Sequence, residues 1–96
     1  MTARRLAELG CKPALAAHVR LRFDKARDCW TLQAPERSFM LDETAHAIIV
    51  RCDGAADLEA IIEDLRAAFG DPARETVERD VLALVQDLAD KGVIGL

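Results

Sequence analysis

The fold is decided by residues 41–54, LDETAHAIIVRCDG. Asp42 is placed to accept a hydrogen bond from the exposed amides of a following helical turn. Four apolar residues then recur at helical spacing: Ala45, Ile48, Ile49 and Cys52. Gly54 is a natural stop for such a helix. The stretch therefore predicts a capped amphipathic helix that follows directly on a segment rich in strand signals.

That preceding segment alternates apolar and polar residues with the period of two typical of a strand with one buried face. Two runs show it: Val19, Leu21 and Phe23, then Trp30, Leu32 and Ala34. A polar turn at residues 25–28 separates them, which predicts an antiparallel hairpin. Pro35 ends the second strand because it cannot donate a hydrogen bond to a sheet.

A short third strand is predicted at residues 38–41. Its alternation places Phe39 and Leu41 on one face and Ser38 and Met40 on the other. Because it would lie last in the sheet, we expect one edge of its backbone to be unpaired.

Two further helices are predicted downstream. The first begins near Asp57 and ends before Gly70, and its apolar face carries Leu58, Ile61, Ile62, Leu65 and Phe69. The second covers about residues 76–91, and Val93 and Ile94 are expected to fold back onto its end. The sequence thus predicts an α+β, winged helix-turn-helix-like fold, a three-stranded antiparallel sheet followed by three helices. Residues 1–96 form one domain, with residues 1–12 expected to be mobile.

The composition is that of a small folded protein: 96 residues, 51% hydrophobic and 31% charged. So short a chain leaves little room for an enclosed active site, which favours surface recognition. No apolar run approaches the roughly 18 residues of a membrane span, so a cytoplasmic protein without a membrane partner is expected. Cys11, Cys29 and Cys52 form no CxxC pair and are expected to be free thiols.

Charge is unevenly distributed. Residues 1–41 hold eight Lys or Arg against four Asp or Glu, and residues 42–96 hold five against thirteen. Either two solvated faces simply differ in sign, or each half steers a different partner. A winged-helix DNA-binding regulator is the alternative function. Ten acidic against four basic residues in 57–91 argue against nucleic acid as a partner, because phosphates would be repelled.

The apolar positions of the third helix span roughly 160° of its circumference, more than one packing contact usually needs. In one interpretation Val77, Val81, Leu84 and Leu88 face the other helices, while Leu82, Val85 and Ala89 pack beneath the sheet. In the other, this second edge lines an open groove. A groove beside an unpaired strand is suited to an extended peptide that binds by strand addition. The same edge could pair with a second copy, so a homodimer stays open.

Enzymatic chemistry is not indicated. The sequence has no P-loop, dinucleotide fingerprint, zinc pattern or CxxxCxxC motif, so no cofactor or metal is expected. His46 falls off the apolar stripe of its helix, which favours a surface histidine over a catalytic one. Trp30 is expected to pack on the sheet.

Several segments, in order and spacing, resemble the PqqD family: residues 12–15, 19–24, 30–36, 45–49, 52–54, 80–82 and 88–92. The resemblance implies a non-catalytic chaperone that binds the ribosomal precursor peptide PqqA and presents it to the radical S-adenosylmethionine enzyme PqqE. It also implies a RiPP recognition element, in which the peptide lies between the third strand and the third helix. The expected peptide-binding residues are Ser38, Phe39, Met40, Leu41, Glu78, Val81, Leu82, Val85, Gln86 and Ala89.

Overall fold

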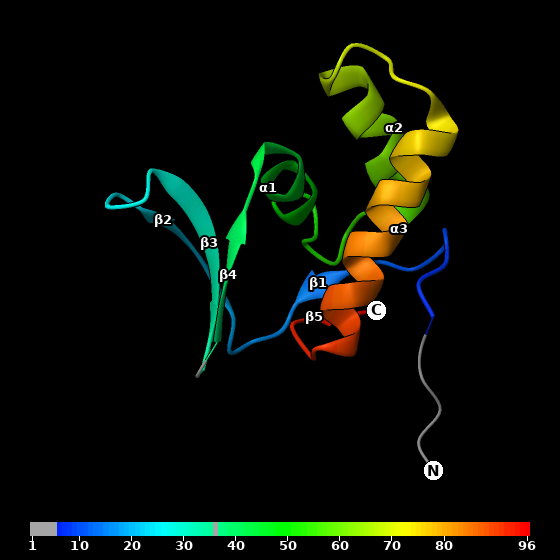
Figure 1. The fold of residues 1–96 in the computed structure, drawn as a ribbon. Helices are drawn as coiled ribbons and strands as arrows, with labels where there is room; N and C mark the ends of the chain where they lie inside the picture. Colours follow the sequence, from blue (N-terminus) through cyan, green and yellow to red (C-terminus); the bar gives the residue numbers. More distant parts are fainter. Residues whose placement is uncertain (1–5, 36) are drawn as a thin grey trace.

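The computed structural model describes residues 6–35 and 37–96. Figure 1 shows a three-stranded sheet on one side of a group of three helices, with a small second sheet beside the C-terminal end of α3. The elements are β1 (Ala14–Leu15), β2 (Arg20–Asp24), β3 (Cys29–Ala34), β4 (Arg37–Leu41), α1 (Glu43–Ile49), α2 (Leu58–Ala68), α3 (Arg74–Asp90) and β5 (Ile94–Gly95). This confirms the α+β, winged helix-turn-helix-like fold.

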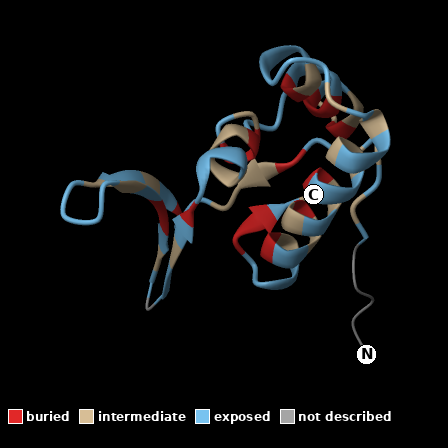
Figure 2. Cartoon of the chain, turned by 45° about the horizontal axis from the view of Figure 1, so that its top comes forward, coloured by how far each residue is buried: buried red, intermediate tan, exposed pale blue. Residues whose placement is uncertain are grey.

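The larger sheet has the order β2-β3-β4 and is antiparallel throughout. Its register aligns Leu21, Leu32 and Phe39 across the three strands on one face. The hairpin was predicted correctly, but the burial of its aromatic residues was not. Phe23 is 45% exposed and Trp30 is 36% exposed, because the turn end of the hairpin extends beyond the helices (Figure 2).

The second sheet was not predicted. β1 pairs antiparallel with β5, and Ala14 also bridges to Asp53. Val93 and Ile94 do fold back as expected, and both are buried. A strand of two residues is too short to show a detectable periodicity, so the sequence pattern could not reveal β1 or β5.

The helix caps and the end of α2 before Gly70 follow the sequence, but the end of α1 and the burial of Phe69 do not. Asp42 caps α1 and Asp57 caps α2, each through a carboxylate that accepts an amide hydrogen bond, at 2.7 and 2.8 Å. α1 ends at Ile49, well before Gly54. Phe69 was expected on the buried face of α2, yet it caps that helix and is 44% exposed.

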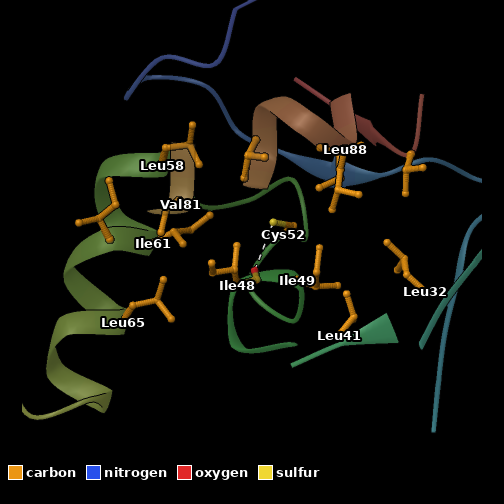
Figure 3. Packing of buried hydrophobic residues seen from close by; sticks show 14 of the residues in the cluster. Leu32, Leu41, Ile48, Ile49, Cys52, Leu58, Ile61, Leu65, Val81 and Leu88 are labelled. Carbon is orange, nitrogen blue, oxygen red and sulfur yellow. Dashed lines mark hydrogen bonds between the residues drawn. The ribbon is translucent and has the colours of Figure 1, made fainter. Parts of the chain in front are cut away.

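The core lies where the three helices meet the sheet, as Figure 3 shows for Leu32, Ile48 and Ile61. Cys52 belongs to this core, and its Sγ donates to the carbonyl of Ile48 at 3.3 Å. Burial, with a smaller contribution from the charge of Asp53, raises the pKa of the Cys52 thiol to about 12.

The chain before β1 is fixed to the helices. The carbonyls of Leu9 and Cys11 accept from the amides of Glu59 and Leu58, at 3.1 and 2.9 Å. The amide of Ala7 donates to the side chain of Gln86 at 2.7 Å. Residues 1–12 were expected to be mobile, and within them Ala7, Leu9 and Cys11 form hydrogen bonds and pack against the core. Residues 1–5 lie outside the described residues.

The turn between α1 and α2 depends on glycine. Gly54 has φ +81°, and a Cβ there would lie 3.3 Å from Cβ of Ala14.

We predict that Gly54→Ala lowers the free energy of unfolding by about 2 kcal/mol, since it adds this contact to the cost of a left-handed backbone. Gly70→Ala is the matched control, because Gly70 has φ +80° with nothing within 4 Å of its added Cβ. It should lose only about 1 kcal/mol in urea denaturation. Equal losses would contradict the contact with Ala14.

The three thiols should differ in reactivity. Cys11 and Cys29 are partly exposed, whereas Cys52 is buried and its thiol has a raised pKa. Because the thiolate is the reactive form, iodoacetamide at pH 8 should label Cys52 at least about tenfold more slowly than the other two. Peptide mass spectrometry over a labelling time course measures this. Labelling in urea is the control, and there the three rates should converge.

Candidate functional site

The candidate site starts at the edge of β4. This strand pairs with β3 on one side, and within residues 6–35 and 37–96 no strand pairs with its other side. Alternate amides and carbonyls along that edge are therefore available to another extended chain. Ser38 and Met40 are exposed, Phe39 is half-buried and Leu41 is buried. The faces of β4 are those predicted from its alternation.

An open hollow of about 300 Å³ adjoins the end of this strand. Asp42 belongs to it because β4 runs into α1 with a single residue between them. The lining comes from the start of α1 and the middle of α3: Asp42, Thr44, Ala45, Ile48, Asp80 and Leu84. The hollow thus has an apolar floor and carboxylates at its margin.

The opposite end of β4 meets the C-terminal end of α3. Arg37 donates to the carbonyl of Lys91 at 2.6 Å. Both cations lie over the ring of Phe39, with the Arg37 Cζ 5.8 Å and the Lys91 Nζ 5.5 Å from its centroid. These contacts hold the start of β4 against α3.

The structure divides the predicted α3 residues among different surroundings. Val81 and Val85 are buried in the core. Glu78 lies 3.6 Å from Arg74, which also binds Glu59 of α2, and Gln86 accepts from the amide of Ala7. At 100° per residue, Leu82 and Ala89 share the flank of Glu78 and Gln86. None of these six residues lines the hollow, and the peptide-binding role of the Leu82 edge stays a prediction.

Leu84 and Asp80 occupy the flank that faces α1 and β4, and sequence reasoning missed both as site residues. The physical reason is that periodicity defines two flanks beside the buried stripe but not which neighbour covers each one. The segment before β1 reaches the flank of Leu82 at Gln86, whose side chain accepts from the amide of Ala7, and the same segment had been expected to be mobile. Lys91, in contrast, was detectable as the basic residue at the end of this helix.

An aromatic group lies beside the last residue of β4, because Trp30 of β3 pairs with Leu41 in the sheet. Trp30 stacks on His46 of α1 with ring centroids 4.6 Å apart, and it meets Phe23 edge to face at 5.4 Å. His46 is therefore packed against the sheet and is half-buried rather than a plain surface residue. The stacking helps to fix α1 on the sheet.

In the part of the chain that the structure describes, no group of three His, Cys, Asp or Glu residues is arranged to hold a metal ion. None of the described helices is both long and apolar enough to cross a membrane.

The chain is similar to proteins of a known family. Residues 29–94 match the family described as Coenzyme PQQ synthesis protein D (PqqD). A PqqA binding protein of Rhodopseudomonas palustris is 48% identical over 84 residues, which cover 88% of this chain and 81% of the relative. A PqqA binding protein of Xanthomonas oryzae is 44% identical over 85 residues, which cover 88% and 91%.

Solved structures agree. The solution structure of the PqqD truncation of Methylobacterium extorquens PqqCD, described as a functional and stand-alone RiPP recognition element, aligns with TM-score 0.74 and 37% identity over 88% of each chain. The crystal structure of PqqD from Xanthomonas campestris aligns with TM-score 0.59 and 42% identity, covering 86% of this chain and 91% of that one. The fold, the family match and these relatives together show that the chain belongs to the PqqD family.

Proposed function

We propose that this protein binds the precursor peptide PqqA as an additional strand on β4 and presents it to the radical S-adenosylmethionine enzyme PqqE. The observation that carries the proposal is the unpaired edge of β4 beside the hollow lined by Leu84 and Ala45. Relatives at up to 48% identity are named PqqA binding proteins, which supports the choice of peptide.

Strand addition accounts for both affinity and selectivity at this site. Main-chain hydrogen bonds to β4 hold any extended peptide, and side chains that alternate along the added strand distinguish one peptide from another. Those on one face of the sheet would lie beside Phe39 and Leu41, with Leu84 across the hollow. Those on the other face would lie beside Ser38 and Met40.

The protein acts in this proposal as a non-catalytic carrier in the cytoplasm. Its exposed groups around β4 form a recognition surface, and the hollow beside that strand is open rather than enclosed. For contact with PqqE, the charge asymmetry offers two surfaces: the sheet face of Arg20 and Arg22, or the acidic helices. A second copy paired through β4 would compete with PqqA for the same edge.

A titration of the isotopically labelled protein with unlabelled PqqA tests the proposal. We expect saturable shifts of backbone amides concentrated in β4, in the first turn of α1 and around Leu84, because those groups border the added strand. Heteronuclear NMR gives the measurement, and double-stranded DNA at the same concentration is the control. Shifts with DNA instead of PqqA would favour the regulator, and no shifts with PqqA, alone or with PqqE, would refute peptide binding here.

Substitution of two leucines on α3 tests which flank of this helix contacts the peptide. Leu84 lines the hollow, whereas Leu82 lies on the flank of Gln86, which contacts Ala7. We predict that Leu84→Ala weakens PqqA binding about tenfold, through loss of roughly 1.4 kcal/mol of apolar contact. Leu82→Ala is the matched control and should stay within about twofold.

Isothermal titration calorimetry measures both affinities, and circular dichroism confirms that each variant is folded. The reverse order, with Leu82→Ala the weaker binder, would show that the peptide uses the flank originally predicted from the sequence.

A further inference from the structure

One end of the β4 edge is basic. Arg37 begins the strand and bonds to the last turn of α3, where Lys91 lies beside it over Phe39. Lys91 is partly neutralised by Asp87, whose carboxylate lies at 2.8 Å. Arg37 forms no ion pair with any of the described residues, and it is exposed. Its guanidinium therefore keeps donors for an incoming carboxylate.

The other end of the edge is acidic. Asp42 follows the last residue of β4 and Glu43 follows next, and Asp80 lines the same hollow as Asp42. Asp42 uses one carboxylate oxygen to cap α1. The described residues supply an ion-pair partner to neither Asp42 nor Glu43. Asp80 has the neighbouring Arg79 at 3.7 Å, and both side chains are exposed.

The two ends lie one strand length apart. β4 has five residues, which at about 3.3 Å per residue extend over roughly 16 Å. That distance exceeds the Debye length of about 8 Å at physiological ionic strength, so each end acts on its own part of a bound peptide. An added strand thus meets a positive potential at one end and a negative potential at the other.

We infer that this edge selects a peptide whose added strand carries a carboxylate at the Arg37 end and a cation at the Asp42 and Asp80 end. The inference rests on the proposed strand addition and extends it, because it assigns charge positions that fix the direction and register of the peptide. Strand pairing alone leaves both undefined, since backbone hydrogen bonds are the same for any residue. Opposite charges at the two ends penalise the reversed orientation.

Charge exchange between protein and peptide tests this inference. The protein variants are Arg37→Glu and Asp80→Lys. The probes are PqqA and a set of PqqA variants, in which each acidic residue is changed singly to Lys and each basic residue singly to Glu. We expect each protein variant to weaken PqqA binding about fivefold at low salt, the scale of a partly exposed charge pair. One particular acidic-to-Lys peptide should restore binding to Arg37→Glu, and one particular basic-to-Glu peptide to Asp80→Lys.

Two controls carry the same charge changes outside the site. Arg20→Glu lies on β2, at the opposite edge of the sheet, and Glu75→Lys lies on the far side of α3 from Asp80. In the absence of PqqE, both should bind PqqA within about twofold of the unchanged protein. Calorimetry gives affinities, and the amide shifts of β4 show whether strand pairing persists.

The outcomes distinguish the inferred charge positions from the proposed binding of PqqA to β4. Restored binding with one peptide per variant supports the assigned charge positions. Unchanged affinity in Arg37→Glu and Asp80→Lys, or losses that no peptide exchange restores, would overturn the inference while β4 shifts still supported the proposed function. Absence of PqqA binding to the unchanged protein, also with PqqE present, would overturn both.

Discussion

The direct passage from β4 into α1 is the constraint on which the rest of the structure depends. One residue, Asp42, separates the last strand residue from the first helical residue, and it is fixed by a 2.7 Å hydrogen bond to the amide of Ala45. With no loop to absorb rotation, the position of α1 determines where the open edge of β4 points. Ile48 and Ile49 then anchor α1 in the core, so the site is positioned by burial rather than by loop geometry.

An unpaired strand edge is ordinarily a hazard, because it can pair with any exposed strand. Here the start of the strand is held by Arg37 against α3, and the strand is only five residues long. Charged groups at both ends limit which chains can approach. The features that restrict unwanted pairing are thus also those that would give the proposed site its selectivity.

The sequence was sufficient for elements whose periodicity is strong. The β2–β3 hairpin, the capping carboxylates of Asp42 and Asp57 and the faces of β4 were all predicted, because alternation and cap chemistry are local properties. The same local signals predicted an unpaired β4 edge.

What escaped prediction depends on contacts distant in sequence. The pairing of β1 with β5 joins residues about eighty positions apart, and neither strand has a recognisable pattern. The side of α3 that faces the sheet could not be found from a helical wheel, because the wheel contains no information about which element covers each flank. Phe23 and Trp30 were expected to be buried, but the hairpin extends past the helices, and only the packed structure reveals how far.

The stacking of Trp30 on His46 has an optical consequence. Trp30 is the single tryptophan of the chain, and its ring lies where the sheet meets α1. Intrinsic emission therefore originates at one known junction, without an attached dye. Any tilt of the sheet relative to α1 changes the surroundings of that indole. The fluorescence of Trp30 therefore reports directly on how the sheet packs against α1.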